Sequence, residues 1–323
     1  MVKEIRHNRG KSRLGSERKD GSQRLRTFSF VATLGIIAII IGASYIGSQP
    51  KVEHIASDFK FTRQPWMSVV PNGIHFVGYV DFQRVYAASG NATFFGQAGL
   101  IDFSQLNYSI LPEDVLYEID IQLLDTNTAV TVLRLQQDMQ NKLGLLFAEA
   151  TKAPSWNFGS YLVRQLLVHT PDQEKPLFGY LSIANDYVLV STDQQTGLQQ
   201  VQTVLGQMTY GTPSFFDNLT VQRAAYAAGY TGEPLLGLFL GTFSSQLQGS
   251  EMIVKSVTSG SAATDMILVT RSVLFPNQDA ALSQYGEAHR IYSGASGYRI
   301  IDSFLVITYQ YSTAKLRSEI TGI

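Results

Sequence analysis

Residues 179–191, GYLSIANDYVLVS, read as a β-hairpin. Two runs of aromatic, β-branched and aliphatic residues flank the polar pair Asn185-Asp186, and such pairs turn a chain back on itself. Residues 297–308, GYRIIDSFLVIT, repeat the pattern around Asp302-Ser303, with one residue fewer before the turn pair. Each copy is followed by a polar helical segment, so a hairpin followed by a helix is the expected repeating unit.

The segments upstream of the two hairpins also follow one order, a strand, then a hairpin, then an amphipathic helix. In the first half these are residues 74–80, 115–135 and 136–150; in the second they are residues 234–240, 252–275 and 276–289. We therefore expect an internal duplication, with one lobe at residues 67–210 and a related lobe at residues 211–323. Chance similarity between two β-hairpins is the alternative.

Adjacent strands of this kind predict the fold class. Hairpins that alternate with single helices indicate an α+β architecture of antiparallel sheets, with helices on one face of each sheet. A parallel doubly wound fold would require strict alternation of strand and helix. The expected fold of residues 67–323 is therefore a pair of antiparallel α+β lobes.

An apolar stretch near the N-terminus predicts the location of the protein. Residues 28–47, FSFVATLGIIAIIIGASYIG, lie within a run that has no charged residue between Arg26 and Lys51. A helix that crosses a bilayer needs about 20 apolar residues. Its length and the lack of a good cleavage site favour an uncleaved signal anchor over a cleaved signal peptide. Residues 48–66 are then expected to form a linker.

Charge is distributed unevenly about this stretch. Residues 1–27 hold nine Lys or Arg and three Asp or Glu, a net charge of +6, whereas the rest of the chain holds 16 basic and 23 acidic residues, a net charge of −7. Basic flanks stay in the cytoplasm, so we expect a disordered cytoplasmic tail and an extracellular or periplasmic C-terminal domain. The lipid bilayer is the expected partner of the tail and span, and nucleic acid is not expected.

The composition excludes several kinds of site. The chain has no Cys, which removes thiol nucleophiles, iron–sulfur clusters and disulfides. Three Asn-x-Ser/Thr sequons provide possible glycosylation sites, at Asn91, Asn107 and Asn218, if the host glycosylates its surface proteins.

Signatures of catalysis or cofactor binding do not appear in the sequence. There is no phosphate-binding loop, nucleophile elbow or zinc-protease motif, and the histidines that follow the span, at positions 54, 75, 169 and 289, lie in separate segments. Glu118 and Asp120 share one face of a predicted strand that ends near Asp125, a set that could hold Ca²⁺. The simpler interpretation is the solvated face of that strand. No catalytic, cofactor-binding or metal-binding residue is therefore predicted.

Part of the ectodomain resembles a known group of proteins. The hairpin at residues 179–191, the stretch SFFDN at residues 214–218, the stretch VQRAA at residues 221–225 and the strand beginning near Leu235 follow a familiar order. Residues 71–81, PNGIHFVGYVD, resemble the opening strand of the same group. The group consists of membrane-anchored extracytoplasmic proteins of unknown function with a duplicated hairpin-helix ectodomain. The resemblance implies an extracytoplasmic α+β domain and no catalytic residues.

Three functions remain open from the sequence. The first is a single-pass membrane-anchored protein with a non-enzymatic binding or assembly role in the cell envelope, where the partner would be another envelope protein. The second is a ligand- or lipid-binding ectodomain with a cleft between its lobes. The third is a hydrolase whose site is assembled from scattered residues.

Overall fold

A computed structural model describes the chain at residues 50–89, 101–103, 108–150, 156–161, 164–169, 180–184, 187–193, 195–242, 246–259 and 265–321. The chain divides into two units, residues 1–50 and residues 51–323, and the fold below is that of the second unit. The predicted tail and span lie outside the described residues. Within the described part of the chain, no helix has the length and apolar character to cross a membrane.

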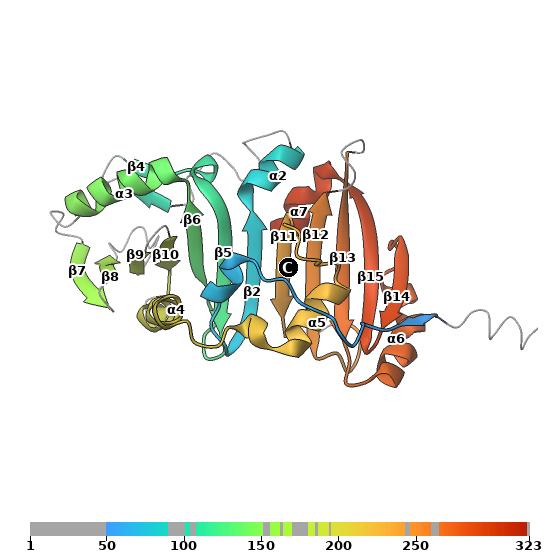
Figure 1. Cartoon of the computed structure of the whole chain (residues 1–323). Helices are drawn as coiled ribbons and strands as arrows, with labels where there is room; N and C mark the ends of the chain where they lie inside the picture. The colour runs from blue at the N-terminus through green and yellow to red at the C-terminus, as the bar shows by residue number, and fades with distance from the viewer. Residues whose placement is uncertain are drawn as a thin grey trace, which may run out of the picture. The chain divides into compact units, whose positions relative to one another are not determined.

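The described strands form a 13-stranded sheet in which the parallel pairing of β1 with β14 is the exception to antiparallel pairing (Figure 1). The order across the sheet is β1-β14-β15-β13-β12-β11-β2-β5-β6-β10-β9-β8-β7. The strands span Val52–Glu53 (β1), Ile74–Asp81 (β2), Val115–Leu123 (β5), Val130–Leu135 (β6), Trp156–Tyr161 (β7), Arg164–His169 (β8), Tyr180–Ala184 (β9), Tyr187–Ser191 (β10), Gly237–Gly241 (β11), Met252–Ser259 (β12), Met266–Leu274 (β13), Gly297–Ile301 (β14) and Phe304–Ser312 (β15). A separate two-stranded sheet pairs β3 (Ile101–Phe103) with β4 (Tyr108–Ile110).

Two successive sets of five strands have the same order in this sheet. The first set runs β2-β5-β6-β10-β9 and the second runs β11-β12-β13-β15-β14, and the sets meet where β2 pairs with β11. In each set the third strand leads to a helix and the fourth and fifth strands form a hairpin. We call these sets the first half and the second half of the sheet. Both halves belong to one continuous sheet.

Helices cover both faces of the sheet, which corrects the expectation of helices on one face. The front face packs against η1 (Pro65–Val69), α4 (Gly197–Tyr210), η5 (Phe215–Asp217) and α5 (Leu219–Ala227). The back face packs against α2 (Phe82–Ser89), α3 (Gln137–Ala150), α6 (Gln278–Ile291) and α7 (Leu316–Thr321). Two further short 3-10 turns are η4 (Pro112–Asp114) and η6 (Thr313–Lys315).

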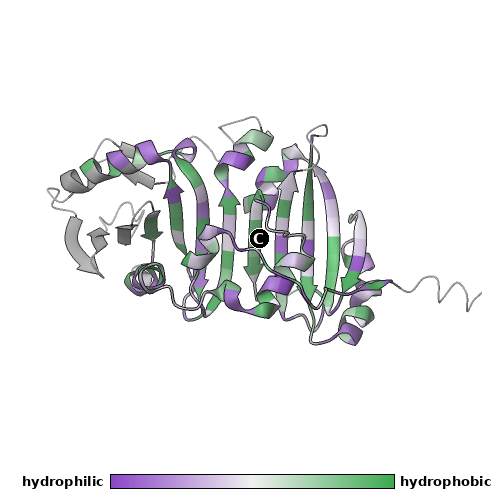
Figure 2. Cartoon of the chain, viewed as in Figure 1, coloured by the Kyte–Doolittle hydropathy of each residue, from purple (hydrophilic) through white to green (hydrophobic). Residues whose placement is uncertain are grey.

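The coverage on both faces explains the hydrophobic runs in the central strands. All residues of β10, YVLVS, and of β11, GLFLG, are buried, because successive side chains point to opposite faces and both faces are packed. Figure 2 shows hydrophobic residues along these and neighbouring strands. One apolar core therefore lies on each side of the sheet, with Leu133 and Val257 among the back residues and Val132 and Leu238 among the front ones.

Local signals in the sequence explain several helix ends. The Asp81 carboxylate accepts a hydrogen bond from the Arg84 N–H at 2.9 Å and begins α2. Asn277 caps α6 by accepting from the Ala280 N–H at 2.9 Å, and Gly211 ends α4 in the left-handed conformation with φ of 58°. The mixed α+β class and the hairpins at 115–135, 252–275 and 297–308 are confirmed.

Three local expectations differ from the structure. The mixed composition of residues 89–111 predicts a loop with a short helical turn, but the structure has β3 and β4 in this segment. The pattern of residues 161–169 predicts one strand, but the structure places the described residues of this segment in the β7–β8 hairpin. The segment expected as a linker joins the fold, because β1 pairs with β14 and η1 packs against α4. Backbone pairing with a distant edge strand leaves little trace in a segment of mixed composition.

Candidate functional site

Two neighbouring carboxyl groups lie on the back face of β5. Glu118 and Asp120 are two residues apart, so their side chains point the same way, and they hydrogen bond to each other. The Thr131 hydroxyl, from the paired position on β6, donates to Asp120 at 2.6 Å. The cross-strand neighbours of Glu118 are the buried Val80 and Leu133. We call Glu118 and Asp120 the carboxyl pair.

Burial and like charge both act on this pair. Burial raises the pKa of Glu118 well above its ordinary value, and the charge of Asp120 and the hydrogen bond between them raise it further. Burial also raises the pKa of Asp120, whereas the hydrogen bonds from Thr131 and Glu118 lower it. Glu118 is therefore the carboxyl that keeps its proton to higher pH, and Asp120 accepts its hydrogen bond. Such a pair places a proton donor beside a proton acceptor.

The structure corrects the interpretation of these residues as a solvated strand face. Both side chains are half-buried, because α2 packs on β5 and the back face carries an apolar core. Asp125 is exposed in the turn after the strand. Among the described residues, no group of three His, Cys, Asp or Glu side chains is placed to hold a metal ion. The alternation of apolar and polar residues in β5 was a correct signal for a strand and a misleading one for solvent.

A polar row on the front face was not predicted. Asp81, Tyr117, Arg134 and Tyr187 are directly opposite one another across β2, β5, β6 and β10. The Tyr117 and Tyr187 hydroxyls are 2.8 Å apart, and the Arg134 guanidinium lies 4.9 Å from the centre of the Tyr187 ring. The row brings hydroxyl, guanidinium and carboxylate groups together on one face of the sheet. No sequence signal marks it, because its four residues come from four strands.

Burial also changes the ionisation of groups in this row. It raises the pKa of Asp81, although the neighbouring Arg84 and the hydrogen bonds that Asp81 accepts lower it. Burial and the hydrogen bond with Tyr187 raise the pKa of Tyr117. Tyr117 is thus a neutral hydroxyl at physiological pH.

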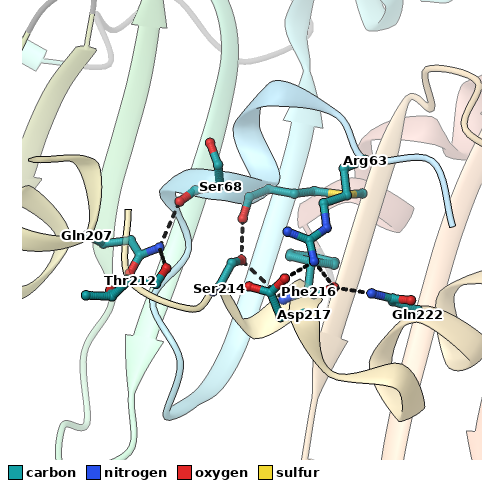
Figure 3. Close-up of polar contacts among 9 residues, drawn as sticks. Arg63, Ser68, Gln207, Thr212, Ser214, Phe216, Asp217 and Gln222 are labelled. Carbon is teal, nitrogen blue, oxygen red and sulfur yellow. Dashed lines mark hydrogen bonds and ion pairs between the residues drawn. The ribbon is translucent and has the colours of Figure 1, made fainter. Parts of the chain in front are cut away.

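The segment at residues 51–70, here called the strap, crosses the front face from the second half of the sheet to the first. Figure 3 shows its end. The Ser214 hydroxyl donates to the Met67 carbonyl at 2.6 Å, and the Gln207 amide donates to the Ser68 carbonyl at 3.0 Å. The Arg63 guanidinium pairs with the Asp217 carboxylate, whose pKa is lowered by this contact. The strap is therefore held by α4, η5 and the loop between them.

The beginning and middle of the strap are also held by hydrogen bonds. Asp302, in the turn between β14 and β15, accepts a hydrogen bond from the Ile55 N–H at 3.3 Å and lies 2.9 Å from His54. Further along, the Tyr230 hydroxyl donates to the Thr62 carbonyl at 2.8 Å, and the Gln64 amide donates to the Gly232 carbonyl at 2.6 Å. The strap thus connects the β14–β15 hairpin with α4 and η5.

The predicted glycosylation sites and histidines lie apart from one another. Asn91 and Asn107 are outside the described residues. Asn218 is exposed and caps α5, where its side-chain oxygen accepts from the Thr220 N–H at 2.8 Å. The histidines lie on separate elements, with His54 in the strap, His75 in β2 beside Thr242, His169 in β8 and His289 in α6 stacked on Tyr298.

Comparisons with known proteins give a limited result. No family model matches the chain, and no curated protein matches it. Three crystal forms of TP0453 are similar in structure. Form I has a TM-score of 0.49 at 12% identity and covers 81% of this chain and 98% of that chain. Form IV has a TM-score of 0.48 at 9% identity and covers 79% of this chain and 96% of that chain. Form III has a TM-score of 0.44 at 9% identity and covers 83% of this chain and 100% of that chain.

Proposed function

We propose that this chain is a single-pass membrane-anchored protein whose C-terminal unit lies outside the cytoplasm and binds another protein of the cell envelope. The strap is the observation that carries the proposal. It begins four residues after the predicted span at residues 28–47, and its hydrogen bonds reach the β14–β15 turn near one end and the loop between α4 and η5 at the other. The strap is thus part of the folded unit, and residues 48–50 are the segment between it and the predicted span.

The surface of α5 supports a binding role. Leu219 and Tyr226 are seven residues apart on this helix, so they share a face, and their exposed fractions are 56% and 38%. The Tyr226 ring lies 4.7 Å from the ring of Phe59 in the strap. Exposed aromatic and aliphatic side chains that lie together are typical of protein-binding surfaces. We expect the envelope partner to contact this surface.

The two halves also support an internal duplication, which we propose as the origin of the ectodomain. The common strand order and the helix after the third strand of each half are the supporting observations. The resemblance to anchored extracytoplasmic proteins with a duplicated ectodomain agrees with this interpretation. The lobe boundary near residue 210 falls between α4 and η5.

Because the chain has no Cys, single cysteines can report both orientation and binding. Leu145 and Tyr210 are exposed at 66% and 67%, so L145C and Y210C should react with a membrane-impermeant maleimide on intact cells. S16C, in the basic tail, should react only after lysis. Labelling of S16C but not of the other two would refute the orientation.

Binding is tested with photo-crosslinking residues placed in the full chain in its native membrane. Crosslinkers at positions 219 and 226 should capture the same protein, and a crosslinker at the exposed position 125 of the β5–β6 turn should not. Absence of a reproducible product at both α5 positions would contradict the binding role without affecting the orientation result.

The carboxyl pair favours a hydrolase as the second candidate. In this role Glu118 would donate a proton and Asp120 would accept one. E118Q and D120N would then each abolish hydrolysis in a panel of peptide, ester and glycoside substrates. Equal activity of the wild-type chain and both variants in that panel would exclude this role.

A further inference from the structure

Two cations lie next to each other on the back face of the second half of the sheet. Lys255 on β12 and Arg271 on β13 are directly opposite in the antiparallel ladder. The Lys255 residue is only 6% exposed, and its ammonium group lies 4.8 Å from the centre of the Phe239 ring. The Arg271 guanidinium lies 5.5 Å from the centre of the Tyr309 ring. Like charges directly opposite in a sheet are unfavourable unless an anion accompanies them.

The C-terminal helix α7 supplies an anion to this surface. The Lys255 ammonium donates to the backbone carbonyl of Glu319 at 2.6 Å, and the Glu319 carboxylate is 3.9 Å from the Arg271 guanidinium. Leu316 and Ile320, on the same helix, are 0% and 5% exposed and belong to the back core. The helix thus places one carboxylate between two apolar anchors.

The contact between the Glu319 carboxylate and the Arg271 guanidinium is long for an ion pair. The 3.9 Å separation of Arg271 and Glu319 exceeds hydrogen-bond length. Arg271 Nε is buried and has no hydrogen-bond partner among the described residues. A carboxylate that engaged the guanidinium by two hydrogen bonds would satisfy this atom. The surface can therefore hold an acidic group better than α7 does.

Size also indicates that α7 is a replaceable occupant. The helix has six residues, and isolated helices shorter than about 12 residues are marginal in water. It follows β15 through the single turn η6 and ends the described chain, so its release would leave every strand of the sheet paired. Its position at the end of the chain can be followed in Figure 1.

We propose that the surface formed by Lys255, Arg271, Phe239 and Tyr309 is a docking site for an amphipathic helix of a partner protein, and that α7 occupies it as an intramolecular competitor. The partner helix carries a carboxylate next to two apolar anchors, the pattern of Leu316, Glu319 and Ile320. Recognition follows the helix-in-groove mode, with the charge contact adding specificity. This inference is independent of the membrane anchor and of the α5 surface.

The experiment uses the full chain and a fluorescent peptide with the sequence of residues 312–321. In the double variant L316S/I320S the intramolecular helix loses its anchors, so this variant should bind the peptide at least tenfold more tightly than the wild-type chain. A matched peptide with Gln in place of the glutamate at position 319 should bind the double variant at least fivefold more weakly. Adding R271M to the double variant should abolish binding.

Equal affinity of the wild-type chain and a folded double variant would overturn the proposal, as would binding that R271M leaves unchanged. Hydrogen exchange of the wild-type chain provides a test that does not depend on folding of the variant. The amides of α7 should exchange at least 100-fold faster than those of β13, because α7 opens while the sheet stays folded. Exchange of both elements at one rate would show that α7 opens only when the sheet unfolds, which would contradict the proposal.

Discussion

Asp120 and Lys255 occupy the same cross-strand row on the back face of the sheet. Asp120 is opposite Gly78 on β2, Gly78 is opposite Phe239 on β11, and Phe239 is opposite Lys255 on β12. The two charged residues are thus each one strand away from the central β2–β11 pair. Burial favours the neutral form of both, since it raises the pKa of Asp120 and lowers the pKa of Lys255.

The ladder registers make these two residues equivalent in the two halves. Tyr187 and Phe304 are equivalent, because each is the first residue after the turn of its hairpin. On the neighbouring strand, Tyr187 is opposite Arg134 and Phe304 is opposite Leu274. On the strand after that, Arg134 is opposite Tyr117 and Leu274 is opposite Met252. Asp120 lies three residues after Tyr117, and Lys255 lies three residues after Met252. Equivalent positions of the proposed duplication therefore carry opposite charges.

Glu118 should make the folded state less stable as pH rises. Its folded-state pKa is raised by burial and by Asp120, so the stability present below its unfolded pKa is lost as pH rises through the folded pKa. E118Q keeps a donor for Asp120 and removes the titration. We expect E118Q to be more stable than the wild-type chain at pH 7 and to show a smaller loss between pH 4.5 and pH 7, measured by urea unfolding. D125N, in the exposed turn, should change the unfolding free energy by less than about 0.5 kcal/mol; equal effects of both variants would contradict the prediction.

Lys255 should produce the opposite pH dependence. Burial lowers its pKa from the ordinary 10.5 to about 8, so the folded state releases the proton first and stability rises between about pH 8 and pH 10.5. Tyrosines with raised pKa act in the other direction above pH 10, so the relevant quantity is the difference between wild type and K255M. This difference should shift in favour of the wild type by up to about 3 kcal/mol across that window. A difference that stays constant from pH 7 to pH 10.5 would contradict the pKa of Lys255.

Ser214 should be the strongest single fastening of the strap. Its buried hydroxyl donates to the Met67 carbonyl and accepts from the Phe216 N–H at 3.2 Å. S214A leaves both groups without this partner, so we expect a loss of about 1–2 kcal/mol in unfolding free energy. Hydrogen exchange at residues 65–70 should also be faster. T203A, which removes an exposed hydroxyl that bonds the Gln199 carbonyl in α4, is the control and should have little effect.

Gly78 should tolerate no side chain, whereas Gly206 should accept one. A Cβ at Gly78 would lie 2.9 Å from the Phe76 ring and 3.2 Å from the Phe239 ring. We expect G78A to lower the unfolding free energy by about 1–3 kcal/mol, because both rings are buried and must move. At Gly206, inside α4, no atom lies within 4 Å of the added Cβ, so G206A should stabilise by about 0.5–1 kcal/mol. Thermal unfolding of the two variants compares the predictions directly, and a stabilising G78A would refute the packing of this row.

The ion pair between Arg63 and Asp217 should contribute less than the buried bonds of the strap. Both side chains are about 40% exposed, at 39% and 43%, so solvent screens the pair. We expect R63A to lower the unfolding free energy by about 1 kcal/mol or less, and by a smaller amount at 1 M salt. Urea unfolding at low and high salt measures this loss. A larger loss of unfolding free energy in R63A than in S214A would contradict the prediction.

The sequence alone predicted many of the elements and their order along the chain. Polar turn pairs between apolar runs identified the hairpins, and helical spacing identified α3, α4 and α6, because these signals arise from contacts between residues close in the chain. The tertiary structure decided everything that depends on register between distant strands. It placed helices on both faces, brought the strap against α4 and η5, half-buried Glu118 and Asp120, and aligned Asp120 with Lys255 across four strands. A strand pattern shows which residues share a face, but only the packed sheet shows what covers that face.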